Sequence, residues 1–242
     1  MSDDEVLSRK DLKAPDKFQE VATRAVDWIS GHKKNARVIS IVVAAAVALA
    51  IVAGLIAGVR SEKAGALAYE VVRAAGAEVS AVPLPGVPGP FYANDAERQK
   101  AVIAAAELAI GEYPSTAAGR LALLMKADAQ YRLGEADAAV ASYQKYLSET
   151  SSDDSLRFGA LDGIAMALES KGKLDEAAAA WERSGREAPL FSDHADIERA
   201  RVLALAGKKD EARKLLEGFA EHHKGSQFAT DAADRLARLG AK

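Results

Sequence analysis

Three segments of the sequence, LGEADAAVASYQKYL (133–147), KGKLDEAAAAWERSG (171–185) and AGKKDEARKLLEGFA (206–220), superpose without gaps. The glycine that each contains recurs at spacings of 38 and 35 residues. Self-similarity at such a spacing is typical of solenoids, in which one supersecondary unit is stacked many times. These segments therefore decide the fold class of the C-terminal half of the chain.

Each recurring position has a physical role in a pair of antiparallel helices. The glycine ends a helix in the left-handed conformation, and the aspartate three residues later is predicted to cap the next helix. Small alanines let the paired helices pack closely, and a large residue nine positions after the glycine fills the space between hairpins. The predicted structural residues are Gly134, Asp137, Ala139 and Tyr143; Gly172, Asp175, Ala177 and Trp181; and Gly207, Asp210, Ala212 and Leu216.

The composition favours helices and excludes several kinds of chemistry. Among 242 residues there are 53 alanines, which have the highest helix propensity, and only 6% aromatic residues, which is few for a sandwich or barrel. The absence of cysteine excludes disulfides, zinc–thiolate sites, iron–sulfur clusters and cysteine nucleophiles. A net charge of −3 argues against a nucleic-acid partner. We therefore expect an all-α protein.

Residues 38–59, VISIVVAAAVALAIVAGLIAGV, are predicted to form a single transmembrane helix. The stretch contains no charge and, as a helix, covers about 33 Å, enough for a hydrocarbon core of about 30 Å. A cleaved signal peptide is the alternative, but its apolar core would be shorter, and 37 residues precede this stretch. Basic residues number four in the 15 positions before the span and three in the 15 after it, which favours a cytoplasmic N-terminus.

Two features near the span have two interpretations each. Gly54 and Gly58 have the GxxxG spacing that lets membrane helices pack closely, although alanine-rich spans also produce this spacing by chance. Residues 1–37 are predicted to form a cytoplasmic stub with an amphipathic helix over about 16–31. This helix either binds the inner membrane surface or a partner helix, or is simply solvated.

Residues 60–112 are predicted to form a degenerate first hairpin. A helix over 62–79 and a helix over 95–112 would be joined by a proline-rich loop, 80–94, which is either a docking segment or a stiff connector. Residues 113–242 hold the repeats and a C-terminal helix over about 226–239. Three side chains of that helix would cap the last repeat: Phe228, Leu236 and Leu239.

The glycine, the alanine five residues later and the aromatic residue nine residues later resemble the second-helix signature of the tetratricopeptide repeat (TPR) family. Pro189 matches the proline that ends the family's repeat. The third repeat departs from the pattern, because Leu216 replaces the aromatic residue and Asp196 takes an otherwise bulky position. The resemblance implies a solenoid of helical hairpins that binds protein partners.

In TPR proteins the first helix of each hairpin lines an inner groove. Transferred to this sequence, that register implies a partner-binding groove of mixed aromatic, apolar and charged side chains. No run of basic residues suits a peptide carboxylate, so a hydrophobic, adaptable protein partner is expected. The implied groove residues are Leu121, Leu124, Asp128, Tyr131 and Arg132; Asp162, Met166 and Glu169; and His194, Ile197 and Arg201.

The sequence contains no recognisable catalytic constellation. Metal-ligand spacings, phosphate-binding loops and nucleophile elbows are absent, and the carboxylates are interleaved with Lys and Arg as on solvated helix faces. His194 with Asp193 and Asp196 is either a weak ion site or a helix-capping cluster. We expect no enzymatic activity, no cofactor, no metal and no small-molecule substrate.

The whole layout resembles the YfgM-like ancillary subunits of the bacterial Sec translocon. These have a short cytoplasmic stub, one span and a periplasmic TPR domain, and the segment RAVDWISGHKKNARVISIV (24–42) is similar in character to theirs. The resemblance implies an inner-membrane protein whose TPR domain is periplasmic. It further implies translocon subunits, periplasmic chaperones or exported chains as partners.

A second resemblance implies a different role. The segments EYPST (112–116) and HHKGSQFA (222–229) look like parts of envelope-assembly TPR domains such as the Tol-Pal coordinator family. That family would make the chain a scaffold for cell-envelope assembly or division machinery. Its members usually have cleaved signals, so the uncleaved span favours the translocon hypothesis.

Overall fold

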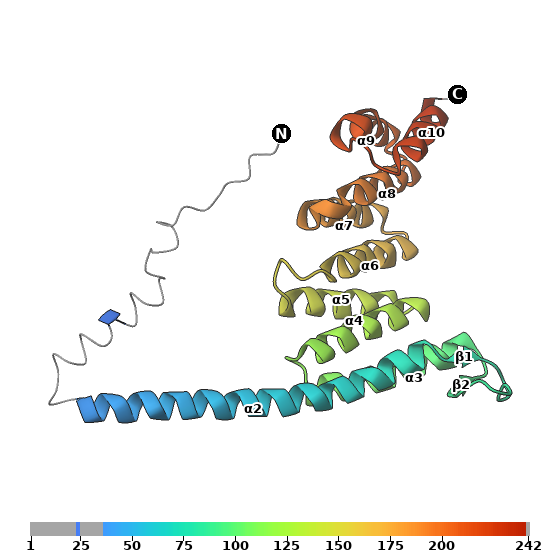
Figure 1. The fold of residues 1–242 in the computed structure, drawn as a ribbon. Helices are drawn as coiled ribbons and strands as arrows, with labels where there is room; N and C mark the ends of the chain where they lie inside the picture. Colours follow the sequence, from blue (N-terminus) through green and yellow to red (C-terminus); the bar gives the residue numbers. More distant parts are fainter. Residues whose placement is uncertain (1–22, 25–35, 241–242) are drawn as a thin grey trace, which may run out of the picture. The chain divides into compact units, whose positions relative to one another are not determined.

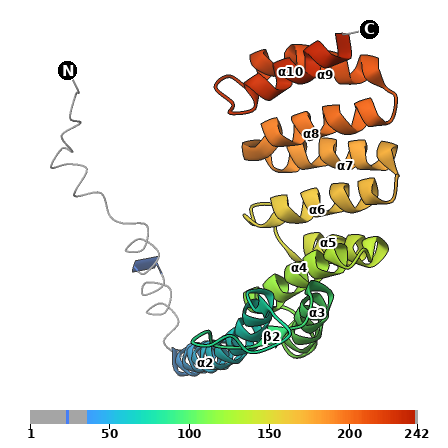
Figure 2. The same ribbon diagram turned by 90° about the vertical axis from the view of Figure 1, so that its right-hand side faces the viewer.

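The computed structural model describes residues 23–24 and 36–240 (Figures 1 and 2). The chain divides into two compact units, Met1–Val59 and Arg60–Lys242. The expected amphipathic helix over 16–31 lies outside the described residues, apart from the two helical residues 23 and 24.

Helix α2 (Ala36–Ala75) contains the stretch predicted to cross a membrane. Within the described residues, one helical segment, Ile41–Ala75, is long and apolar enough to do so by length and composition. The large apolar side chains between Ile41 and Val59 are all more than half exposed within the chain, whereas the core helix of a soluble protein would bury them. Gly54 and Gly58 are also surrounded by open space, so their role in helix packing stays a prediction.

The first hairpin differs from the expected one at its first helix. We expected a separate helix over 62–79, but α2 continues without a break through this region and ends at Ala75. The physical reason is that no proline interrupts residues 36–75, so nothing stops the helix after the apolar stretch. Beyond it, strand β1 (Glu78–Val79) pairs in parallel with strand β2 (Phe91–Tyr92). Strand β2 lies within the segment 80–94 that we expected to be loop, so the proline-rich stretch between the two strands is 80–90.

Helix follows helix through the rest of the second unit. The helix expected over 95–112 is present as α3, and two of the helices begin at side-chain caps: Asn94 accepts from the Glu97 N–H and Thr116 from the Gly119 N–H. The remaining elements are α4 (Ala117–Arg132), α5 (Ala136–Glu149), α6 (Arg157–Ser170), α7 (Leu174–Glu187), η2 (Pro189–Phe191), α8 (Ser192–Leu205), α9 (Lys209–His222) and α10 (Ala229–Gly240), with α3 spanning Asp95–Glu112.

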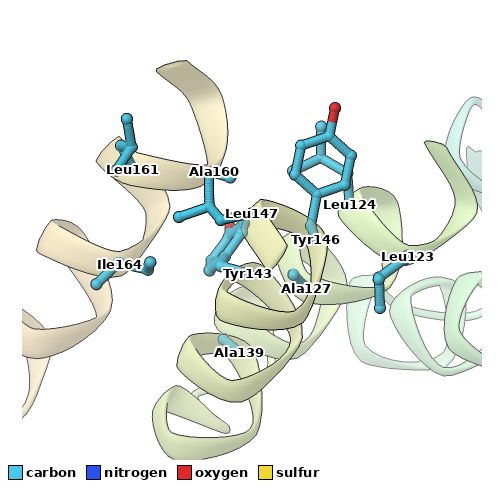
Figure 3. Close-up of a cluster of buried hydrophobic side chains, with 10 residues drawn as sticks. All are labelled: Leu123, Leu124, Ala127, Ala139, Tyr143, Tyr146, Leu147, Ala160, Leu161 and Ile164. Atoms are coloured by element: carbon cyan, nitrogen blue, oxygen red, sulfur yellow. The ribbon is translucent and has the colours of Figure 1, made fainter. Parts of the chain in front are cut away.

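From α3 onward, each helix packs mainly against its neighbours in sequence, as both views of the ribbon show (Figures 1 and 2). This one-dimensional stacking confirms the predicted all-α, TPR-like solenoid. The core is a series of clusters shared between successive hairpins. In one of them, Tyr143 and Tyr146 of α5 lie between side chains of α4 and α6 (Figure 3).

The recurring glycines and alanines lie where close packing and helix ends require them. Gly134, Gly172 and Gly207 have φ values of +78°, +69° and +80°, the left-handed region in which a side chain is strained. The alanine five residues after each glycine is fully buried. The large residues Tyr143, Trp181 and Leu216 are also buried.

The predicted capping role of the repeat aspartates is wrong. The residues before α5, α7 and α9 are Glu135, Lys173 and Lys208, none of which caps with its side chain. The aspartates lie further in, at the second helical position, where a negative charge still suits the helix dipole. Asp137 pairs with Lys171 and Asp175 with Lys208, so each of these links one hairpin to the next.

The C-terminal helix α10 covers the last hairpin. It begins at Ala229 rather than at Ser226, because the Ser226 hydroxyl accepts from the Phe228 N–H within the preceding turn. Phe228, Leu236 and Leu239 pack against the buried cluster of Ile197, Ala200, Leu216, Phe219 and Ala232. Without these three side chains that cluster would face water.

Candidate partner-binding face

The exposed side chains of α4, α6 and α8, the first helices of three successive hairpins, form what we call the first-helix face. Three of the implied groove residues do not belong to it. Leu124, Asp162 and Ile197 are only 8%, 7% and 1% exposed. Leu124 and Ile197 belong to the packed core, and Asp162 is used within the chain, so these three assignments are corrected.

The α4 part of the face keeps its polar residues accessible. The exposed residue Asp128 accepts a hydrogen bond of 2.6 Å from the Tyr143 hydroxyl, and Arg132 is exposed at the end of the helix. Both line a cavity of about 200 Å³ that also includes Met125. Tyr131 is half-buried because it packs against the cluster of Figure 3, and Leu121 is half-buried as well.

The α6 and α8 parts of the face are dominated by an ion-pair ladder. The two guanidinium NH groups of Arg201 each donate to a Glu169 oxygen at 2.6 Å, and its Nε donates to Glu198 at 2.6 Å. Arg235 of α10 continues the ladder to Glu198 at 3.4 Å and to Asp231 at 2.8 Å. The hydrogen bonds that Arg201 donates to Glu169 raise the pKa of Arg201 above its ordinary value. These charges are therefore satisfied within the chain.

His194 lies at a junction of three helices and a turn. Its Nε2 is 3.3 Å from Asp162 of α6, whose other oxygen accepts from the buried Ser184 hydroxyl of α7 at 2.9 Å. The rings of Phe158, Trp181 and Phe228 surround the imidazole at centroid distances of 5.5–5.8 Å. His194 is therefore a packing and hydrogen-bonding residue rather than an open groove residue.

The accessible part of the first-helix face is thus smaller than the sequence implied. Met166, which is 37% exposed on α6, is one of the implied residues most available to a partner, together with Arg132 and Asp128 on α4. Of the residues that complete the ladder, Glu198 could have been predicted from the sequence, because it lies one turn before Arg201 on the same helix. The ladder residues of α10 could not have been predicted, since only the fold brings α10 beside α8.

The structure also tests the predicted ion site beside this face. Across residues 23–24 and 36–240, the structure brings together no group of three His, Asp or Glu side chains that could hold a metal ion. The interpretation of His194, Asp193 and Asp196 as an ion site is not supported by their contacts. Asp193 accepts from the Ser226 hydroxyl at 2.7 Å, and Asp196 is 2.8 Å from His223.

The comparisons with known proteins find a family match for one repeat of the chain. The tetratricopeptide repeat model matches residues 121–149, which include most of α4 and all of α5. No curated protein matches the chain. Similar solved structures include a tetratricopeptide repeat protein from Parabacteroides merdae ATCC 43184 (17% identity, TM-score 0.48, 59% of this chain and 54% of that one). A thermophilic TPR protein from Thermus thermophilus is similar at 22% identity, with a TM-score of 0.40, over 59% of this chain and 73% of that one. The chain thus spans about half the length of the first.

Proposed function

We propose that this chain is a membrane-anchored adaptor whose TPR-like solenoid binds protein partners in the bacterial periplasm. The carrying observation is that α2 holds an apolar stretch, with its large side chains exposed, and then the buried residues Ala64, Ala68, Val71 and Ala74 of the solenoid. One helix thus supplies both the anchor and the first layer of the binding domain. The N-terminus would be cytoplasmic and the solenoid periplasmic.

Within this role, we assign the chain to the Sec translocon as an ancillary subunit that links protein export to periplasmic chaperones. The support is the resemblance of its layout to the YfgM-like subunits. The mixed chemistry of the accessible first-helix face also supports it: a thioether at Met166, a guanidinium at Arg132 and a carboxylate at Asp128 suit varied protein partners.

Purification from native membranes tests this assignment. The full-length chain, tagged at its C-terminus, is solubilised in mild detergent and its co-purifying proteins are identified by mass spectrometry. Translocon subunits and periplasmic chaperones are the expected partners. Recovery of envelope-assembly or division proteins instead would reject the export role in favour of a scaffold.

Protease treatment of spheroplasts tests the topology separately. External protease should digest the solenoid in spheroplasts but not in intact cells. A solenoid that is protected in spheroplasts and digested only after lysis would contradict a periplasmic location.

A further inference from the structure

A shallow apolar pocket of about 200 Å³ lies where two inter-hairpin turns meet. One wall is the turn between α5 and α6 with the start of α6, which supplies Asp153, Asp154 and Phe158. The other is the turn between α7 and α8, which supplies Leu190 and Phe191 of η2. We call this site the turn pocket. None of the residues implied for the groove lines it.

The apolar side chains of the turn pocket are unusually open to solvent. Leu190 is 92% exposed and Phe191 41% exposed. The Phe191 ring stacks on the Phe158 ring with centroids 3.8 Å apart and planes 14° from parallel, which leaves a flat aromatic floor. Clustered exposed apolar side chains of this kind mark interaction sites on soluble domains.

The pocket is held in shape by hydrogen bonds of the surrounding turns. The Phe191 N–H donates to the Ala188 carbonyl at 2.9 Å, and the Ser192 hydroxyl donates to the Pro189 carbonyl at 2.8 Å. Arg157 donates to the Leu147 carbonyl at 2.7 Å. A site that is already ordered loses little conformational entropy when a ligand binds.

The charges around the pocket are mostly negative. Three carboxylates, those of Asp153, Asp154 and Glu187, line it together with one guanidinium, that of Arg157. Arg157 pairs with Glu187 at 3.0 Å, and Glu187 also pairs with Arg183 at 2.6 Å, so the negative charge of the rim is carried by Asp153 and Asp154. Asp153 is paired with no described cation, and a hydrogen bond with Ser151 lowers its pKa, so it is ionised at neutral pH. The rim therefore attracts positive charge and repels anionic lipid headgroups.

We propose that the turn pocket binds a protein segment in which a large apolar side chain is followed directly by lysine or arginine. The apolar side chain would lie on the Phe158–Phe191 floor beside Leu190, and the basic residues would face Asp153 and Asp154. This site is separate from the first-helix face, so one solenoid would hold two partner segments at once. The inference requires that the chain binds proteins but does not require the export role.

Two labelled peptides test the chemistry of the site. Full-length protein in lipid nanodiscs is titrated into fluorescein-labelled GSGLKKGSG and GSGLEEGSG, and binding is followed by fluorescence anisotropy. We expect the basic peptide to bind at least about tenfold more tightly than the acidic one, and to lose affinity as salt rises, because the rim charges are exposed. Equal affinity for the two peptides, or no binding of the basic one, would reject the proposal.

Substitutions with matched controls test whether the basic peptide binds at the turn pocket. Leu190→Ser should lower the affinity for the basic peptide by about tenfold, and Asp153→Asn should lower it by about threefold. The controls are Leu108→Ser, which replaces a 62% exposed leucine of α3, and Asp234→Asn, which replaces an exposed aspartate of α10. All four positions are exposed, so folding is checked simply by thermal melting. Equal effects of pocket and control variants would overturn the assignment.

A photo-reactive residue at position 190 shows which molecule occupies the turn pocket. We expect crosslinks in native membranes to other proteins, at peptides that carry an apolar residue next to lysine or arginine. Crosslinks only to lipid or to a second copy of the chain would contradict it. Variants of Arg132 and Met166 should leave peptide binding unchanged, so a failure of the turn pocket is distinguishable from a failure of the first-helix face.

Discussion

The guanidinium of Arg201 on α8 binds the carboxylate of Glu169 on α6 through two hydrogen bonds of 2.6 Å each. Both residues were implied to face a partner, yet they bind each other across two hairpins. A bidentate pair of this geometry fixes the spacing and rotation of successive first helices. Charged residues of the first-helix face therefore contribute to the stiffness of the solenoid.

Replacing Arg201 with Gln should lower the free energy of unfolding by about 1–2 kcal/mol, because Glu169 loses its cationic partner and Glu198 keeps only Arg235, while both carboxylates are partly buried. Urea unfolding measures this. The matched control is Lys208→Gln, which removes another inter-hairpin pair, with Asp175. That pair is largely exposed, so its loss should lower the free energy of unfolding by less than the loss of the Arg201 pairs does. Equal costs would contradict the structural role of Arg201.

Gly163 on α6 lies where the Tyr143 ring of α5 packs closely against α6. A Cβ there would lie 2.2 Å from Cζ and 2.5–2.7 Å from two further carbons of the Tyr143 ring. Gly163→Ala should therefore destabilise the solenoid by about 1–3 kcal/mol through overpacking.

The control for this substitution lies one turn earlier on the same helix. A Cβ at Gly159 meets nothing within 4 Å, so Gly159→Ala should be neutral or stabilise by up to about 1 kcal/mol through helix propensity. Thermal melting of the two variants compares them. The packing described here would be wrong if Gly163→Ala melted at or above the temperature of the unmodified protein.

His194 should make stability depend on pH. The hydrogen bond with Asp162 raises the pKa of His194 against the opposing effect of burial, and Glu198 and Asp193 add to the rise. Since the pKa in the folded chain lies above the unfolded value of about 6.5, the stabilisation is complete below that pH. It is lost as pH rises through the folded pKa.

The expected result is that His194→Gln costs more free energy of unfolding at about pH 5.5 than at about pH 8.5. Asp162→Asn, which keeps the shape of the side chain, should flatten this pH dependence. A cost of His194→Gln that stays constant over the range would show that the ion pair does not form.

Much of this architecture follows from the sequence because its determinants are local. A left-handed glycine such as Gly172, a buried alanine five residues later and a large residue such as Trp181 are set by neighbours along the chain. The apolar stretch of α2 could likewise be predicted from its composition. The register of the aspartates was misjudged, because a side chain at the cap and one at the second helical position both suit a helix start.

The candidate site was less predictable because it depends on contacts between helices far apart in sequence. Whether Asp162 faces a groove or bonds to Ser184 depends on how α6 is rotated against α7. The ladder from Glu169 to Arg235 spans α6, α8 and α10, and the turn pocket joins residues near 153 to residues near 190. Helical periodicity alone does not determine these contacts.

Site-specific photo-crosslinking in native membranes tests the central claim, that the first-helix face of an anchored solenoid binds proteins of the export machinery. The probe is placed at Met166 on α6, with a control probe at Gln144, which is exposed on the second helix α5. We predict adducts with translocon subunits, periplasmic chaperones or exported chains at position 166 and few at position 144. Protein adducts absent from position 166, equally frequent at both positions, or formed only with envelope-division proteins would contradict the account.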